Sequence, residues 1–298
     1  MNPIKSIRTG LRDVRDIDTR VTSVERALDR MRLAQGRIEA RMTRSAASLR
    51  ESEFQVFSQF GEDGIIQYLV ERVPIESERF IEFGVENYTE ANTRFLLENN
   101  GWSGLILDSS RDHIKHIRGQ EYYWKHELTA VEAMIDRDNV NTLFREHGFD
   151  GEIGLLSVDI DGNDYWIWEA VDAVNPPIVI VEYNHRFGSE RPVTIPYSPE
   201  FNRMEAHHSA IYYGASLAAL TKLAGRKGYD LVGCNGGGNN AFFVRSDLRP
   251  DTVPAASVEE AFVAGKFRES RDKEGRLAYL TAEEERKLLE SLPLETID

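Results

Sequence analysis

Two apolar segments that each end in a carboxylate most constrain how this chain can fold. Residues 79–85 (RFIEFGV) read as a buried strand with Glu82 near its carboxyl end. The following Gly84 lets the backbone turn tightly and approach a ligand that a Cβ would repel. A helix over residues 91–100 then leads into a second apolar strand, which ends at Asp108. The pattern predicts a right-handed βαβ unit with an acid at both strand tips.

These acidic tips favour one kind of cofactor over others. An acid at the second tip can bind both hydroxyls of a ribose, while the first tip faces the rest of the cofactor. NAD is disfavoured because Gly84 is followed by Glu86 and Tyr88 instead of the G-x-G-x-x-G pattern, and no Gly-Lys-Ser or Gly-Lys-Thr phosphate loop occurs. S-adenosylmethionine, with its sulfonium, amino group and ribose, suits the acids better. The alternative is that Glu82 and Asp108 only cap strand ends.

The chain has 298 residues, of which 41% are apolar. This length and composition fit one α/β domain with additional segments. The single cysteine, Cys234, excludes an internal disulfide framework and an all-cysteine metal site. The sequence has no apolar run of about 18 residues and no apolar signal-peptide core at its start. We therefore expect a soluble, cytoplasmic protein.

Charge is distributed unevenly along the chain. Residues 1–50 hold 12 Lys and Arg against 6 Asp and Glu, a net charge of +6, whereas the remainder holds 24 against 44, a net charge of −20. The body should therefore repel nucleic acid, so we predict no nucleic-acid partner, and only the basic arm would attract polyanions.

The arm over residues 1–50 also carries a heptad pattern. One seam position holds Ile7, Val14, Val21, Leu28, Gln35, Met42 and Leu49, and the position three residues on holds Ile17, Val24, Met31 and Ile38. This pattern predicts a coiled-coil oligomerisation helix that forms a dimer or trimer. The alternatives are a single amphipathic helix folded back on the domain, or a peripheral membrane contact through the arginines.

The rest of the chain divides into an α/β domain over residues 51–250 and a helical extension over 251–298 that carries no chemical signal. The expected helices lie over residues 52–73, 139–146, 165–170 and 215–224. The expected strands after Asp108 lie over residues 122–128, 153–161, 178–182, 229–233 and 241–244. The last two strands form a hairpin around the glycine-rich tip 235–239, to which we assign no chemistry.

Five motifs in order resemble FkbM-type S-adenosylmethionine-dependent methyltransferases. They are Ser58-Gln59-Phe60-Gly61-Glu62-Asp63, Glu82-Phe83-Gly84, Ala91-Asn92-Thr93, Gly101-Trp102-Ser103-Gly104 and Asp159-Ile160-Asp161-Gly162-Asn163-Asp164. The resemblance implies a mostly parallel seven-stranded class I methyltransferase sheet with a C-terminal β-hairpin, and methyl transfer to oxygen. The chain departs from the family where Asn87-Tyr88 replaces the usual second glycine. The cofactor-binding residues we assign are Glu82, Gly84, Asn92, Asp108 and Ser109.

Acids also gather where the fourth and fifth strands end. Asp159 and Asp161 share one face if the strand stays extended that far. Oxygen ligands from Asp161, Glu182 and Asn184 would suit Mg²⁺ or a similar divalent cation, which lowers the pKa of an acceptor hydroxyl. The alternative to a metal site is that Asp161-Gly162-Asn163-Asp164 forms only a turn followed by a helix N-cap.

Candidates for the base that activates the acceptor are Asp164, His185, Asp159 and His208. Similar macrolide-sugar O-methyltransferases place a base where Asp164 stands. His208, beside His207, lies in an insertion before the final hairpin, and adjacent histidines on a loop are more often only solvated.

The sequence therefore predicts an S-adenosylmethionine-dependent O-methyltransferase that acts on a hydroxyl of a sugar, glycan or natural product. The alternative is a catalytically inactive, methyltransferase-like coiled-coil scaffold, suggested by the irregular loop at Asn87-Tyr88.

Overall fold

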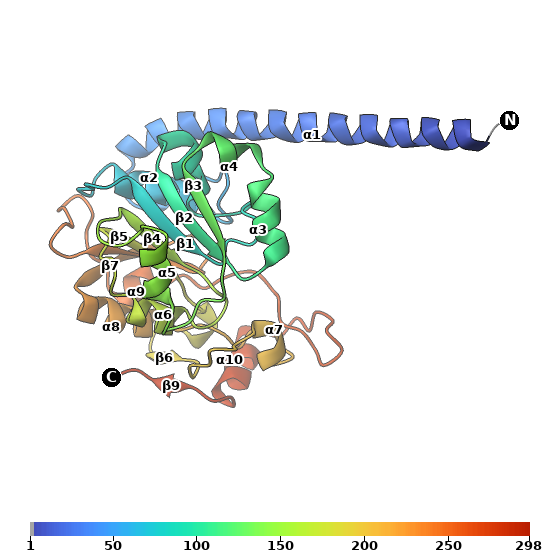
Figure 1. Cartoon of the computed structure of the whole chain (residues 1–298). Coiled ribbons are helices and arrows are strands. Elements are labelled where there is room, and N and C mark those ends of the chain that lie inside the picture. The colour runs from blue at the N-terminus through green and yellow to red at the C-terminus, as the bar shows by residue number, and fades with distance from the viewer. Residues whose placement is uncertain (1–2) are drawn as a thin grey trace.

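A computed structural model describes the backbone of residues 3–298, with side chains from Asp16 onward apart from Asp18. Over this range the chain folds into a sheet covered by helices on both faces, and a long N-terminal helix projects past the sheet (Figure 1). Within the same residues, none of the helices combines the length and apolar character needed to cross a membrane.

The central sheet has the order β3-β2-β1-β4-β5-β8-β7 over the described residues. Its strands are β1 (Arg79–Phe83), β2 (Ser103–Asp108), β3 (Leu128–Glu132), β4 (Leu155–Val158), β5 (Ile178–Glu182), β7 (Tyr229–Cys234) and β8 (Asn240–Arg245). Strands β1 to β5 pair in parallel, whereas β8 runs antiparallel to both β5 and β7. This is the strand order of the class I methyltransferase fold, so the predicted sheet and its C-terminal hairpin are confirmed.

Two apolar layers hold helices against the sheet. One face carries α5 (Val140–Glu146), α6 (Asp164–Ala170) and α8 (Leu217–Lys227), and the other carries α2 (Glu62–Val70), the π-helix η3 (Leu96–Asn100) and α3 (Arg111–Arg118). Alternate strand residues serve the two layers: Ile81 packs toward α5 and α6, and Phe80 toward α2. Because both faces are covered, the strands are apolar almost throughout.

Shorter elements surround these layers. They are η1 (Thr43–Ser45), η2 (Arg50–Ser52), α4 (Glu121–Lys125), η4 (His185–Phe187), β6 (Val193–Thr194), α7 (Arg203–Ala206), α9 (Val258–Ala261), α10 (Ala282–Glu290) and β9 (Glu295–Thr296). Strands β6 and β9 pair with each other, which ties the C-terminal extension to the insertion that follows β5.

Three predicted elements are placed wrongly. The third strand is β3, not residues 122–128, because α4 buries Tyr122 against Tyr88 with ring centroids 5.7 Å apart. The helix predicted over residues 52–73 begins only at Glu62, and the fourth strand ends at Val158. An aromatic run such as residues 122–124 fits a helix turn or a strand equally well, so tertiary packing decides between them.

The long helix α1 (Pro3–Met42) confirms that the arm is helical. Leu49, predicted as the last seam position, lies past the helix end and is buried in the body, so that assignment is wrong. The side chains of Ile7 and Val14 lie outside the described residues. Self-association through the seam stays a prediction at this point.

Candidate active site

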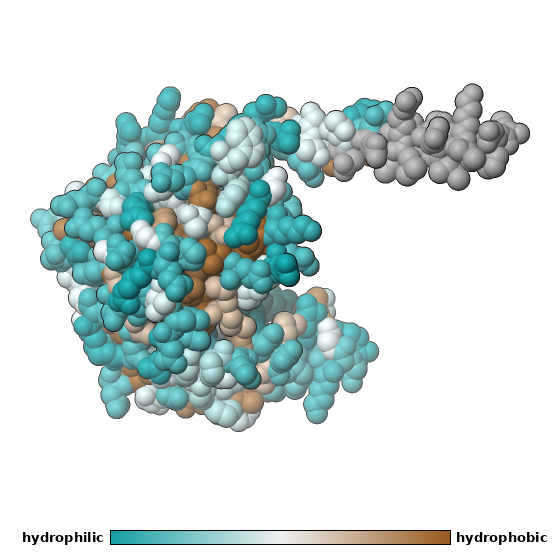
Figure 2. Space-filling view, in the orientation of Figure 1, coloured by the Kyte–Doolittle hydropathy of each residue, from teal (hydrophilic) through white to brown (hydrophobic). Residues whose placement is uncertain are grey.

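Two adjoining cavities open at the carboxyl ends of the parallel strands. The β2-side cavity, about 530 Å³, is lined by Asp108 and Ser109, and the β5-side cavity, about 410 Å³, by Glu82, Asn92 and Glu182. Both are lined by Gly84, Glu86, Asp159, Asp161, Arg203 and Glu269. All five residues assigned to cofactor binding therefore line one cavity or both. Figure 2 shows the surface hollowed between the body and the region of α7.

Gly84 lies where β1 and β4 meet, at the point where the strand order reverses. Its φ is +64°, and a Cβ there would lie 1.7 Å from the carbonyl oxygen of Asp159. Only glycine fits such a position, because the conformation is left-handed and another backbone passes directly beside it. This close approach keeps the tips of β1 and β4 together, at the place where open parallel sheets bind ligands.

The loop after Gly84 turns without the second glycine. Glu86 and Tyr88 adopt φ values of +47° and +61°. The Tyr88 side chain is buried, and its hydroxyl lies 2.9 Å from Thr93 Oγ1. Burial of the Tyr88 ring offsets the backbone strain. The departure from the family pattern is therefore accommodated within the fold.

The acids at the tips of β1 and β2 are hydrogen-bonded by nearby backbone. Glu82 accepts from the backbone N–H groups of Asn92 (2.8 Å) and Thr93 (3.1 Å), and from the Thr93 hydroxyl. Burial nevertheless raises the pKa of the Glu82 carboxyl to about 7, although these hydrogen bonds lower it. Asp108 accepts from the N–H groups of Glu86 (2.8 Å) and Ser110 (2.8 Å).

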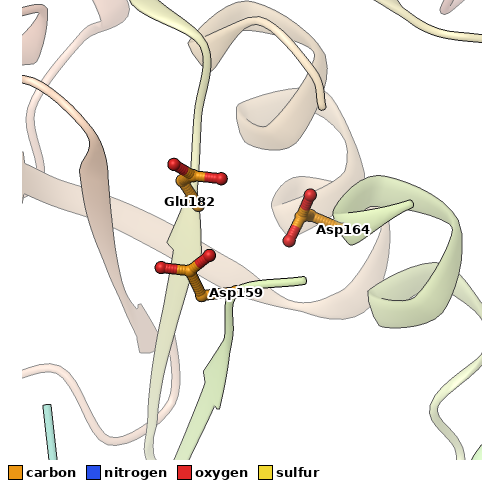
Figure 3. Close-up of side chains that lie close together, drawn as sticks. All are labelled: Asp159, Asp164 and Glu182. Carbon is orange, nitrogen blue, oxygen red and sulfur yellow. The ribbon is translucent and has the colours of Figure 1, made fainter. Parts of the chain in front are cut away.

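Three carboxylates gather at the tips of β4 and β5. One oxygen from each of Asp159, Asp164 and Glu182 lies within 4.8 Å of the others (Figure 3). Asp164 Oδ1 accepts from the N–H of Ile160 at 2.8 Å, and its Oδ2 from the N–H of Gly162 at 2.9 Å. Asp164 is therefore occupied in closing the turn after β4, and it does not line either cavity.

The other two acids of this cluster lack such partners. The Asp159 carboxylate accepts no hydrogen bond from the described residues, and buried Glu182 Oε2 likewise has no partner among them. Desolvation, followed by the neighbouring carboxylates, raises the pKa of both groups well above the usual range. Carboxylates that lie this close together without partners are stable only if a cation, a hydrogen-bond donor or bound protons compensate their charge.

Asp161 does not join the cluster, contrary to the predicted ligand set. The backbone turns at Asp161, with φ +54°, instead of staying extended. Its side chain is exposed and accepts from Arg203 Nη1 at 2.5 Å. Arg203 also lies 2.7 Å from Glu269 and stacks over the Tyr213 ring at 3.8 Å. Arg203 and Glu269 come from α7 and the C-terminal extension, where the sequence carries no chemical signal.

Asn184, the third predicted metal ligand, is also occupied elsewhere. Its amide nitrogen donates to the carbonyls of Ile211 (2.9 Å) and Tyr213 (3.1 Å), and its Oδ1 accepts from Arg186 N. The side chain is fully buried and occupied in holding the insertion, so the prediction that it binds a metal is not supported by this arrangement.

Neither candidate histidine lines the two cavities. His185 packs edge-on against Phe267, and burial lowers the pKa of its imidazole to about 3. His208 is exposed and lies beside His207, with ring centroids 4.1 Å apart. Of the four predicted base candidates, only Asp159 therefore lines the cavities.

The glycine-rich hairpin tip positions a residue that the sequence analysis missed. Asn240 pairs in register with Glu182, so the two side chains share one face of the sheet. Asn240 Nδ2 donates to Glu62 Oε1 at 2.9 Å, while buried Asn240 Oδ1 has no partner among the described residues. The motif residue Glu62 thus orients Asn240 in the β5-side cavity.

No family model and no curated protein matches this sequence. Among solved structures, the chain is similar to the N-terminal domain of EvdMO1 with SAH bound, at 13% identity over 61% of this chain and 79% of that chain, with a TM-score of 0.38. It is also similar to the O-methyltransferase from Bacillus cereus in complex with SAH (12%; 56% and 72%; TM-score 0.37). A third is an O-methyltransferase family protein from Burkholderia thailandensis (12%; 74% and 59%; TM-score 0.39). Each TM-score is below 0.5, so these likenesses carry no argument about the function of this chain.

Proposed function

We propose that this chain is an S-adenosylmethionine-dependent O-methyltransferase that acts on a hydroxyl of a sugar, glycan or natural product. One observation carries the proposal. Adjoining cavities join Asp108, an acid placed as in ribose-binding sites, to Asp159 and Glu182, whose carboxylates lack partners among the described residues.

The β2-side cavity suits the nucleoside part of the cofactor. Asp108 would accept from the ribose hydroxyls, and the apolar walls at Met134 and Ile135 would contact the base. Gly84 lines both cavities, so the remainder of the cofactor would lie across the joined tips of β1 and β4 and reach the β5-side cavity.

The β5-side cavity suits an acceptor that carries hydroxyl groups. Glu182 Oε2 and Asn240 Oδ1 are neighbouring buried acceptor atoms, and hydroxyls supply the donors that they lack. The Phe60 and Phe267 rings line the same cavity and stack with centroids 5.6 Å apart. They offer an apolar surface to a ring beside the polar groups.

Asp159 is the residue placed to accept the hydroxyl proton. It lines both cavities, and its raised pKa makes it a more effective base than an exposed carboxylate. When bound, the cofactor supplies the methyl group and becomes S-adenosylhomocysteine. Asp159 would accept the proton that the acceptor hydroxyl loses in the transfer.

A divalent cation held by the same acids is the alternative to Asp159 acting as the base. The unpartnered Glu182 Oε2 and the Asp159 carboxylate are hard oxygen donors, which Mg²⁺ prefers. These two residues, with Asp164 beside them, would hold the ion, and they replace the predicted set of Asp161, Glu182 and Asn184. A bound ion would lower the pKa of the acceptor hydroxyl. Chelation should then reduce turnover while cofactor affinity stays unchanged, and added Mg²⁺ should restore turnover.

Titration calorimetry with S-adenosylmethionine and S-adenosylhomocysteine tests the proposal. We expect heat of binding with both compounds, and a rise in the thermal midpoint. A chain that gives neither response with either compound would contradict cofactor binding. A screen of cell-envelope glycans for methyl transfer then separates the enzyme from an inactive scaffold, since a scaffold would bind without transferring methyl to any acceptor.

A further inference from the structure

The N-terminal helix α1 has two distinct contact faces, and the body covers only one. On the covered face, Gly36 is buried, and a Cβ there would lie 2.4 Å from Val56 Cγ2. Leu33 and Ala40 pack on the same side against a small apolar cluster of the body, made up of Phe54, Val56, Phe57 and Phe95.

Ion pairs fix the rotation of the helix about its own axis. Asp29 lies 3.2 Å from Arg94 Nη2, and Arg26 lies 3.3 Å from Glu121. Because these contacts hold one side of α1 against the body, the opposite side is held toward solvent (Figure 1).

The uncovered face carries the heptad seam. Its apolar members are between 49% and 68% exposed; they are Ile17, Val21, Val24, Leu28, Met31, Ile38 and Met42. With Gln35 among them, their spacing alternates strictly between four and three residues. The stripe runs over 26 residues of helix, which is about 39 Å at 1.5 Å per residue. Exposed apolar residues at this strict spacing mark an interaction surface.

We propose that this seam pairs with the same seam of a second copy of the chain in a parallel, two-stranded coiled coil. The Gln35 side chain selects the orientation. In a parallel, in-register pair it faces its own counterpart, and the two amides can bond to each other. In an antiparallel pair it would face apolar seam residues instead.

One pair of charges beside the described part of the seam agrees with this register. Arg20 precedes the seam residue Val21, and Glu25 follows Val24. In a parallel pair, residues at these two flanking positions lie opposite each other, five residues apart in sequence. Arg20 of each helix therefore meets Glu25 of the other, which gives two symmetric ion pairs. The body lies on the covered face, so the two bodies would flank the coil on opposite sides.

Mass measurement by light scattering on the full chain tests the pairing. The wild type should have twice the monomer mass, and Leu28→Asp with Met31→Asp should reduce it to the monomer mass. Both residues face solvent in the single chain, so its fold should not change. Arg30→Asp, which adds the same side chain outside the seam, should leave the dimer intact. A seam variant that keeps the wild-type mass, or a wild type that is monomeric or trimeric, overturns the proposal.

Cysteine cross-linking tests the orientation independently. Val24→Cys, a seam substitution that leaves Gln35 in place, should form a disulfide between identical positions under mild oxidation, whereas Arg30→Cys, directed away from the seam, should not. The native Cys234 is buried and should not interfere. Absence of a Val24→Cys cross-link in a chain of dimer mass overturns the parallel register. If the wild type is monomeric and binds phosphatidylserine vesicles through α1, the seam contacts a membrane and the proposal is wrong.

Discussion

The acids at the tips of β1 and β2 differ from those at the tips of β4 and β5 in one respect. Glu82 accepts hydrogen bonds from backbone N–H groups of the loop after β1, and Asp108 accepts from one N–H in that loop and one in the loop after β2. Asp159 and one oxygen of Glu182 have no such partner among the described residues. The first pair therefore holds its loops in place before any ligand arrives. The second pair lacks the donors or cation that a ligand would supply.

The difference predicts which acids hold the fold and which would take part in the proposed reaction. Substitution of an acid that holds a loop should lower stability and binding together. Substitution of an acid without a partner should lower activity and leave the fold intact, or even stabilise it, because charge repulsion is removed.

The largest expected effect tests the unpartnered acids. Asp159→Asn should lower kcat by about 10²–10⁴-fold, because the amide cannot accept the hydroxyl proton. The thermal midpoint of this variant should equal or exceed that of the wild type. Asp164→Asn provides the matched comparison: it should lower the thermal midpoint, because Asp164 accepts from the N–H groups of Ile160 and Gly162. Full activity of Asp159→Asn would remove Asp159 from the chemistry.

The next largest expected effect tests the close approach of Gly84, which follows β1, to the Asp159 carbonyl, which follows β4. Gly84→Ala should destabilise the protein by about 3 kcal/mol or more, since the new Cβ would collide with the Asp159 carbonyl and φ is +64°. Gly101→Ala is the control. Its φ is +76°, and a Cβ would meet nothing within 4 Å, so it should cost only about 1 kcal/mol. Urea denaturation of both variants measures the difference, and equal losses would show that the close approach is unimportant.

A smaller effect tests the proposed contact between Asp108, at the tip of β2, and the ribose of the cofactor. Asp108→Ala should weaken S-adenosylmethionine binding by roughly 10- to 100-fold, as expected for lost hydrogen bonds to a charged group. Asp161→Asn should leave that affinity almost unchanged, because Asp161 pairs with Arg203 and not with the predicted ribose position. Calorimetry on both variants checks this, and equal affinities would contradict the placement of the ribose.

The smallest effect is the pH dependence of stability in the ligand-free protein. Folded-state pKa values are raised for Glu82 to about 7 and for Asp164 to about 6, and those of Asp159 and Glu182 are raised as well. The folded chain thus holds protons that the unfolded chain releases above about pH 4. Stability should be greatest at about pH 4 and fall as pH rises to about 7, by roughly 1 kcal/mol per pH unit for each extra proton that the folded chain holds.

Urea denaturation at several pH values between about 5 and 8 measures this slope. Glu182→Gln removes one of the groups with a raised pKa, so its stability should fall less steeply with pH than that of the wild type. A wild-type stability that is flat or rises with pH over this window would contradict the raised pKa values.

Several parts of this molecule follow from local sequence pattern. The apolar runs that end at Glu82, Asp108 and Glu182 form strands where the sequence predicts them, because continuous apolar runs suit strands buried on both faces. Gly84 and Asp108 line the predicted cofactor cavity for the same reason, since parallel strands present their tips at one edge. The arm is helical because its apolar residues follow the heptad period.

Tertiary structure alone decided which further side chains line the two cavities. Arg203, Glu269 and Asn240 reach the cavities from segments that are distant in sequence and show no periodic signal. The turn at Asp161 removes that residue from the predicted metal set, because Asp164 bonds to the backbone on both sides of it. Local pattern determines which segments become strands and helices. Which side chains meet at the cavities depends on long-range packing, and on which acids the backbone already satisfies.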